Sequence, residues 1–561
     1  MTISSTLLAI ALLTSSARFQ ETPLPGADAT ADFDFGQSEV VGLAVGGGGD
    51  RFRDELKPEI RDGVLRLLDA RWRHWTAASF MAVGDGPTRF VEVSWTMTMS
   101  RGTEGAGFLW LPTASCERVG EAPPIDAWEA PDLANAFGVG FDASDPFTLD
   151  PFSGSGNIHD RPQHEVSLQF NGTELAKALC PIDFRDTQPH RIVVRWEAVT
   201  GGAEVTVMVD GQAVFDRRFV SALEGYEGRP AFGARNTDTA GFVALDDLSI
   251  RLGEQVPPAA PPLTFVAIDR ALNDGGHKRN EGSVAFPDDT SAYGRILCTI
   301  RLDKPETRFD PWDRIASISV VDDEGVEREI VRYITPYHRG HEWTVDVSDF
   351  RPWLRGQRTI VQRCGTYGEG WVVTVTFRFC PGPTDRLAER VEPLWSGSCV
   401  IGDPDRPPSG FYLPRTVSVD DSTIGAKVVT IVTGHGMSPN TNNAAEFMPI
   451  WRTLVVNGTP FRNRLWKTDN YLNPCRPQGG TWKYDRAGWA PGDVVAPWEV
   501  DVTSLLDARR TLEIEYELDP YVNEARGKAS APVHVTAGYL VLYGPGGGPS
   551  PAATGHTEST P

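Results

Sequence analysis

The sequence predicts an all-β protein built from several antiparallel sandwiches, and three observations support this fold class. Short runs rich in β-branched and aromatic residues recur along the chain, as in RIVVRW (Arg191–Trp196) and VVTVTFRF (Val372–Phe379). Turn residues separate the runs, among them Asp210-Gly211, and the chain holds 56 Gly and 43 Pro. Amphipathic helical stretches are few. A chain of 561 residues has room for about three or four such domains.

The N-terminus resembles an export signal. The apolar stretch Leu7–Leu13 is too short to span a bilayer, and the small residues Ser15, Ser16 and Ala17 follow it, although no Lys or Arg precedes it. We therefore expect a signal peptide over residues 1–17 and a secreted or periplasmic protein. No later stretch reaches the length of about 18 apolar residues that a transmembrane helix needs, so no membrane span is expected.

The charge balance excludes two classes of partner. Lys and Arg number 53 against 75 Asp and Glu, a formal net charge of −22. Binding of nucleic acid without sequence preference needs cationic groups that displace counterions, and binding to an anionic membrane surface needs a basic cluster. We expect no nucleic-acid partner, and we expect a monomer.

The cysteines do not form a metal or redox motif. Seven are scattered without any CxxC pair, which excludes zinc-ribbon and thioredoxin-like sites. Most are expected to be buried free thiols. One disulfide among Cys364, Cys380 and Cys399 stays open.

Residues 29–254 form the first predicted module, and the proline-rich stretch 255–263 is a linker. FGVGFDASDP (Phe137–Pro146), HEVSLQFNG (His164–Gly172) and the strand pattern ending in DDLSI resemble the concanavalin A-like lectin/glucanase jelly roll. This resemblance implies a weak calcium site with four candidate ligands, namely Asp142, Asp145, Asp160 and His164. The same aspartates also suit plain turn capping, and Gly140 stands where those lectins have an acid. Without paired catalytic carboxylates, a binding or structural role is favoured.

The second predicted block runs from Thr264 to Tyr543, and residues 544–561 form a low-complexity tail expected to be disordered. Strands are expected at ASISVV (Ala316–Val321) and VTAGYLVL (Val535–Leu542). The most helix-like stretch, PGPTDRLAERVEPL (Pro381–Leu394), is interpreted as a hinge between two domains over residues 264–383 and 390–543.

Four polar loops of this block carry acids, arginines and aromatic residues, and the sequence places them at FDPWDR, YITPYHRGHEW, TGHGMSPNTNNAAEF and GGTWKYDRAGWAPGD. Trp rings stack on the C–H faces of sugars, while carboxylates and guanidinium groups bind hydroxyls. The pattern therefore indicates sugar recognition. The alternative is that the Asp-Arg pairs are surface ion pairs and the Trp residues belong to cores.

In order and composition these loops resemble the peptide-N-glycosidase F family of secreted bacterial amidases, over about half the chain. The resemblance implies two packed eight-stranded antiparallel jelly rolls with the active site between them. It implies catalytic roles for Asp313 and Glu446, with Arg314 offsetting negative charge. It further implies five substrate-binding residues, namely Trp312, Ile334, His435, Arg486 and Trp489.

The implied reaction is hydrolysis of the amide that joins GlcNAc to an Asn side chain, so the implied partners are N-linked glycans and glycoproteins. An amide is a poor electrophile, and its hydrolysis needs an activated water and stabilised negative charge. Like-charged neighbours raise the pKa of a carboxyl group, and Asp310 and Glu446 are candidates for that effect. No cofactor is expected for catalysis, and no metal is expected in the amidase domain.

Several positions depart from the family pattern. A third acid of the family falls near Cys364 or Gly365, and Glu369 is the nearest substitute. Ala444 and Met448 replace a disulfide pair beside the second acid, and Ala490 leaves Cys475 without its family partner.

Two other functions stay open. A non-catalytic glycan or glycopeptide binder on the same scaffold fits the missing third acid. A copper-dependent peptide hydroxylase shares the double jelly roll, but its clustered histidines are absent from the sequence, in which HRGH (His338–His341) is the nearest approach.

Overall fold

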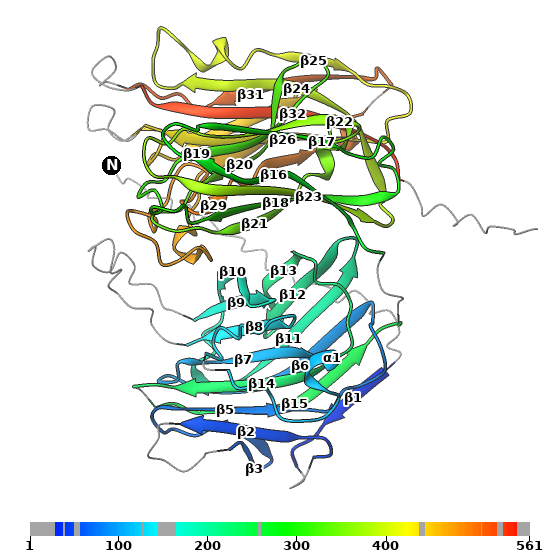
Figure 1. The fold of residues 1–561 in the computed structure, drawn as a ribbon, viewed down its shortest axis with the longest axis vertical. Coiled ribbons are helices and arrows are strands. Elements are labelled where there is room, and N and C mark those ends of the chain that lie inside the picture. Colours follow the sequence, from blue (N-terminus) through cyan, green and yellow to red (C-terminus); the bar gives the residue numbers. More distant parts are fainter. Residues whose placement is uncertain are drawn as a thin grey trace, which may run out of the picture.

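The computed structural model describes residues 29–36, 40–49, 57–125, 127–143, 164–238, 240–255, 260–436, 444–506, 508–523 and 531–546. The predicted signal peptide and residues 547–561 lie outside this set. Within it nearly all of the regular secondary structure is β-strand, arranged in six antiparallel sheets, and the all-β prediction is confirmed (Figure 1). No helix in these ranges has the length and apolar composition to cross a membrane.

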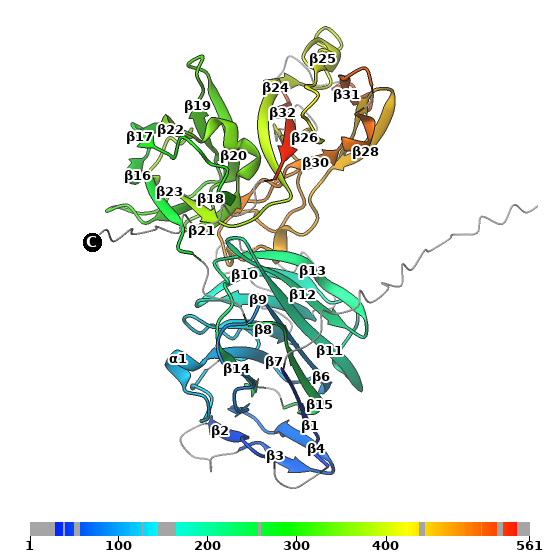
Figure 2. The same cartoon turned by 90° about the vertical axis from the view of Figure 1, so that its right-hand side faces the viewer.

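The first module is a sandwich of two sheets (Figure 2). One sheet contains β1 (Ala29–Phe33), β3 (Glu59–Arg61), β4 (Val64–Leu68), β6 (Phe90–Ser100), β11 (Asp186–Val199), β12 (Gly202–Val209), β13 (Gln212–Ser221) and β15 (Val243–Leu252). The other contains β2 (Ala44–Gly49), β5 (His74–Ser79), β7 (Gly105–Pro112), β8 (Phe137–Asp142), β9 (Glu165–Phe170), β10 (Thr173–Leu179) and β14 (Gly228–Asn236). A single helical turn, α1 (Thr113–Cys116), follows β7.

The alternation of side chains places the core of this module. In β7, Phe108 and Trp110 face the other sheet and join its core, while Leu109 and Leu111 face outward. The outward residues are nevertheless buried, because Trp128 packs over them from the loop before β8. The seven-stranded sheet is therefore covered on both faces at its centre.

The first jelly roll has eight strands of its own. One sheet orders β16 (Leu263–Asn273), β23 (Trp371–Pro381), β18 (Tyr293–Asp303) and β21 (Glu342–Asp346). The other orders β17 (Arg279–Ala285), β22 (Gln357–Cys364), β19 (Ile315–Val321), β20 (Glu327–Ile334) and β29 (Asp493–Val494), the last of which comes from the distant second half of the block. The short 3₁₀ helix η1 (Ser348–Trp353) follows β21.

The second jelly roll also has eight strands. One sheet orders β24 (Arg386–Val400), β32 (Val533–Pro545), β26 (Gly425–His435) and β30 (Trp498–Asp501). The other orders β25 (Arg415–Ser418), β31 (Thr511–Leu518), β27 (Ile450–Val456) and β28 (Thr459–Leu465). In the described part of this domain there are also three 3₁₀ turns: η2 (Pro408–Gly410), η4 (Asn470–Leu472) and η5 (Thr503–Leu505).

The helix-like interpretation of Pro381–Leu394 is wrong, because β24 pairs with β32 along its whole length from Arg386. The apolar residues Ala388, Val391 and Leu394 are three apart, which imitates a helix. In the strand the pairing shifts between Ala388 and Arg390 and again between Pro393 and Trp395. Each bulge inserts an extra residue, so the inward positions lose their period of two.

All seven cysteines are free thiols, so the disulfide left open for Cys364, Cys380 and Cys399 is not formed.

Arg332 on β20 joins the two jelly rolls. Its side chain is 1% exposed, and its Nε and Nη2 atoms donate to the Glu329 carboxylate at 2.7 and 2.8 Å. Its Nη1 atom crosses to the other jelly roll, where it donates to the Val535 carbonyl at 2.5 Å and to the Thr433 hydroxyl at 3.1 Å. From β32, the Tyr539 hydroxyl donates back to the Glu329 carbonyl at 2.7 Å.

Replacement of Arg332 by Met should lower the free energy of unfolding by about 3–5 kcal/mol, because Glu329 and the crossed carbonyl lose their buried partner. Urea unfolding followed by tryptophan fluorescence measures this. Arg363→Met is the control, since Arg363 is 51% exposed and pairs with Glu327 at the surface. The control should stay within about 1 kcal/mol of the parent, and equal effects of the two variants would contradict the bridging role of Arg332.

Candidate active site

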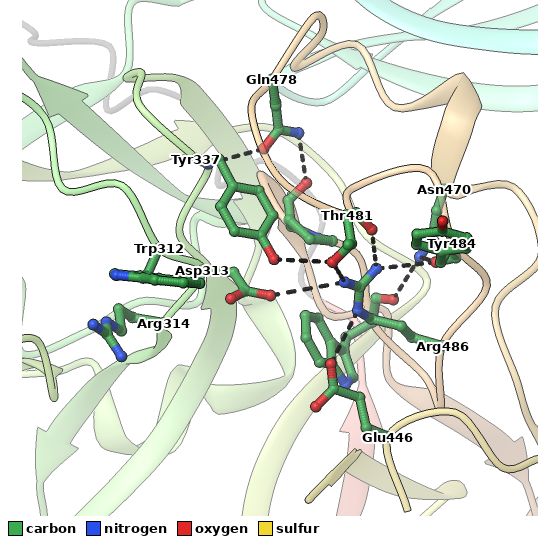
Figure 3. A network of polar contacts seen from close by, with 12 residues as sticks. Trp312, Asp313, Arg314, Tyr337, Glu446, Asn470, Gln478, Thr481, Tyr484 and Arg486 are labelled. Carbon is green, nitrogen blue, oxygen red and sulfur yellow. Dashed lines mark hydrogen bonds and ion pairs between the residues drawn. The ribbon is translucent and has the colours of Figure 1, made fainter. Parts of the chain in front are cut away.

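Three loops from both jelly rolls meet around one buried guanidinium group (Figure 3). Asp313 lies just before β19 of the first jelly roll, Glu446 lies before β27 of the second, and Arg486 lies between β28 and β29. Arg486 is 0% exposed, and its Nη2 atom is 4.0 Å from Asp313 Oδ2. Its Nε atom is 3.4 Å from Glu446 Oε1. The structure therefore brings together the two acids that the sequence predicts as catalytic and one predicted substrate-binding residue.

The backbone around Arg486 fixes its side chain. Nη1 donates to the carbonyl oxygens of Thr481 and Tyr484 at 2.8 and 3.1 Å, and Nη2 donates to the Thr481 hydroxyl at 2.8 Å. Its backbone forms an antiparallel bridge with Lys467, with N···O distances of 2.8 and 3.2 Å. The planar fork of five N–H donors is thus largely occupied, and its orientation is set before any substrate arrives.

Burial raises the pKa of both carboxyl groups. For Glu446 the pKa rises to about 7, because burial and the charge of Asp313 outweigh the opposing effect of Arg486. For Asp313 burial also raises the pKa, against the charge of Arg486 and a hydrogen bond from Tyr337. A carboxyl group that exchanges its proton near neutral pH suits general acid–base catalysis.

The backbone before Glu446 is unusual. Ala445 is buried and has a φ of 67°, in the left-handed region that residues other than glycine seldom adopt. Its carbonyl lies so close to Gly434 that a Cβ atom there would be 2.0 Å from the oxygen. The Glu446 carbonyl in turn accepts a hydrogen bond from the Ala487 N–H at 2.9 Å. These contacts tie the position of Glu446 to the loop that carries Arg486.

Tyr337 and Thr481 belong to this network, although the sequence did not single them out. The Tyr337 hydroxyl is 3.4 Å from the Thr481 hydroxyl, and its N–H donates to Gln478 Oε1 at 3.1 Å. Both residues stand in loops that the sequence marks as polar and aromatic. The contact between their hydroxyl groups joins residues 144 positions apart in the chain, and no local sequence pattern predicts such a contact.

Trp312 and Arg314 flank Asp313 differently. The Trp312 side chain is an exposed ring, at 58%. Arg314 points away from Arg486 in Figure 3. Its Nε atom is 3.9 Å from Asp310, and its guanidinium lies over the Tyr367 ring. Arg486 is therefore the cation in contact with both predicted catalytic acids.

Besides Arg486, two predicted substrate-binding residues are buried, Ile334 and Trp489, and a third, His435, is partly buried. Ile334 and Trp489 are 1% and 3% exposed. The Trp489 indole donates to the Gly434 carbonyl at 2.8 Å and stacks on His435 with ring centroids 5.1 Å apart. Burial lowers the pKa of His435 to about 3, so its ring is neutral. The Arg486 guanidinium lies over the Trp489 ring, with its central carbon 4.8 Å from the ring centroid.

Asp310, in the same loop as Asp313, is a further buried acid close to the site. Asp310 is 0% exposed and accepts hydrogen bonds from the Trp312 N–H at 2.9 Å and from the Thr366 hydroxyl. Glu369 instead forms an ion pair with Arg308 at 3.4 Å. Its role as a third acid stays a prediction.

Only two of the four residues of the predicted calcium site, Asp142 and His164, can be placed, so this site stays a prediction. Asp145 and Asp160 lie outside the described residues. The Lys177 ammonium group is 3.7 Å from Asp142. The rings of His164 and Phe184 pack perpendicular to each other, with centroids 6.1 Å apart. Among the residues that the structure describes, no three His, Cys, Asp or Glu side chains converge as a metal-binding group.

Residues 410–541 match the family model described as "Peptide-N-glycosidase F, C terminal". The chain is 28% identical over 279 residues to the peptide-N(4)-(N-acetyl-β-D-glucosaminyl)asparagine amidase F of Elizabethkingia miricola, over 46% of this chain and 77% of that protein.

Two solved structures are also similar to the chain. One is PNGase F, described as a glycosylasparaginase from Flavobacterium meningosepticum, with 23% identity, a TM-score of 0.47 and coverage of 51% of this chain and 96% of that chain. The other is the lectin UEA-II in complex with galactose, with 12% identity, a TM-score of 0.30 and coverage of 41% and 100%. The sequence matches confirm the resemblance of the second block to the peptide-N-glycosidase F family.

Proposed function

We propose that the protein is an exported amidase that hydrolyses the bond between GlcNAc and the Asn side chain of N-linked glycoproteins. The observation that carries the proposal is the pair of largely buried carboxyl groups, Asp313 and Glu446, that both lie within 4.0 Å of the fixed cation Arg486. The curated relative from Elizabethkingia miricola bears the name of this activity. The reaction leaves Asp in place of Asn and a glycosylamine that loses ammonia.

The geometry supports a different role for each of the three groups. Asp313 acts on the attacking water or on the substrate amide. Glu446, which holds its proton up to about neutral pH, positions the water or the GlcNAc. Arg486, which is buried, offsets negative charge at the site by its positive charge close to both acids, a role that the sequence had given to Arg314. The exposed ring of Trp312 offers a stacking face for a pyranose.

Replacement of Asp313 by Asn should lower kcat for glycan release by roughly 10²–10⁴-fold, the usual range for loss of a general acid or base. The assay incubates a denatured N-glycoprotein with the protein and follows conversion of glycosylated Asn to Asp by mass spectrometry. Asp323→Asn is the matched control, because the Asp323 side chain is 79% exposed and pairs with Arg358 at the surface of the first jelly roll, and it should keep activity within a few fold.

The same assay separates the proposal from a non-catalytic glycan binder. If the unmodified protein binds a glycopeptide in calorimetry and leaves its Asn glycosylated, the amidase proposal is wrong. If Asp313→Asn releases glycan as fast as the parent, the role of Asp313 is wrong.

The raised pKa of Glu446 predicts a pH-dependent stability. Its pKa rises from 4.5 to about 7 on folding, so the folded state binds more protons between these values. The stabilising contribution is present below about pH 4.5 and is lost as the pH rises through 7. The total is about 3 kcal/mol at most.

Denaturant unfolding from pH 4.5 to 8 tests this prediction. Glu446→Gln removes the titrating group, so its free energy of unfolding should decline less than that of the parent over this range. Parallel curves for the two proteins would show that Glu446 titrates normally in the folded state.

A further inference from the structure

The first module contacts the second block at the loop that carries Arg486. Strand β10 lies against η4, at the start of that loop. Arg476 of the loop extends its Nη2 atom to Glu165 Oε2 on β9, at 2.7 Å, and its Nη1 atom donates to the Tyr471 carbonyl at 2.8 Å. Glu165 is 1% exposed. This ion pair is therefore a buried contact between the two parts of the chain.

The sheet face that receives Arg476 is covered by the protein itself. Trp128 and Glu129 lie over three glycines of the seven-stranded sheet. A Cβ atom would be 2.1 Å from the Trp128 carbonyl at Gly107, 2.0 Å from the Glu129 carbonyl at Gly140 and 1.9 Å from the Trp128 ring at Gly233. The acid that lectins carry at the position of Gly140 would clash here. This sheet face is therefore occupied by internal packing and by contact with the second block.

The carboxylates on this sheet face are balanced in part by a cation from the second block. Glu165 lies 3.3 Å from the Lys177 ammonium, which also contacts Asp142 at 3.7 Å and Glu174 at 3.6 Å. One lysine thus faces three carboxylates, and Arg476 supplies a second cation. Burial favours the protonated form of Glu165, but Arg476 and Lys177 reverse this and lower its pKa. Removal of one member of a buried ion pair leaves its partner uncompensated.

A continuous set of contacts leads from Arg476 to the candidate site. Tyr471, whose carbonyl accepts from Arg476, packs with Tyr337 and Trp482, and Leu179 of β10 packs against the same cluster. The Tyr337 hydroxyl meets the Thr481 hydroxyl, which holds Arg486.

We infer that Arg476 is a positioning residue for the candidate site, because its ion pair with Glu165 fixes the loop that orients Arg486 between Asp313 and Glu446. The first module then serves as a support for the catalytic loop. The inference rests on the proposed amidase function only for its kinetic readout.

Replacement of Arg476 by Met should lower kcat for glycan release roughly tenfold to a hundredfold, because Arg486 is no longer held in its orientation. The pH profile should move as well. Asp313 and Arg486 are the charged groups that face Glu446, and Arg486 lowers its pKa, so a displaced Arg486 shifts the Glu446 limb of the profile to higher pH.

Two variants serve as controls. Arg476→Lys keeps the charge and should recover most of the activity and the parental pH profile. Arg195→Met breaks the Arg195–Glu92 pair of the first module at 2.5 Å, far along the chain from the loop, and should lower the melting temperature without moving the pH profile. An Arg476→Met variant with parental kcat and pH profile would overturn the inference.

Hydrogen exchange of the peptide over residues 467–489 separates this inference from the proposed function, since it needs no substrate. Arg476→Met should exchange at least several-fold faster at Arg486 and Ala487, whose N–H groups bond to Lys467 and Glu446. If Arg476→Met exchanges faster but the parent protein releases no glycan, the positioning role is kept and the amidase proposal is rejected. Unchanged exchange in an active amidase would reject the positioning role alone.

Discussion

The candidate site depends on the burial of one cation. Arg486 has no exposed surface, and a buried charge is unfavourable unless every donor has a partner. Carbonyl groups of its own loop satisfy one side of the guanidinium, and two carboxyl groups from different jelly rolls approach the other. The same group limits the rise in pKa that burial imposes on Asp313 and Glu446. Loop shape, electrostatics and the relative position of the two acids therefore have a common origin.

This arrangement requires the jelly rolls to keep a fixed geometry. Arg332 and Tyr539 cross their interface, and one hydrophobic core contains residues of both, such as Ile318 and Val541. A hinge at the boundary would separate Asp313 from Glu446. The stretch that the sequence predicted as a helical hinge is instead part of strand β24, which pairs along β32, and this agrees with the fixed geometry that the site needs.

The sequence predicted the strands well because alternation is a local property. VVTVTFRF and RIVVRW lie inside β23 and β11. It also brought Asp313, Glu446 and Arg486 to one site through ordered loop motifs. It did not predict that Trp489 and Ile334 are buried, because an aromatic or aliphatic residue in a polar loop can face either way. It gave no role to Tyr337 and Thr481, whose contact joins distant segments. Gly140 stood as an unexplained departure, since its cause is the carbonyl of Glu129 above it.

Strand β29 has a consequence for the order of assembly. It holds only Asp493 and Val494, yet it pairs with Tyr333 and Ile334 at the edge of the sheet in the first jelly roll. During synthesis β20 leaves the ribosome long before these two residues have been added to the chain. In the nascent first jelly roll β20, which pairs with β19 on one side, is therefore an edge strand whose other side is open, a feature that favours contact with other chains. Its sheet is completed only when most of the second jelly roll has emerged, so the two halves mature together.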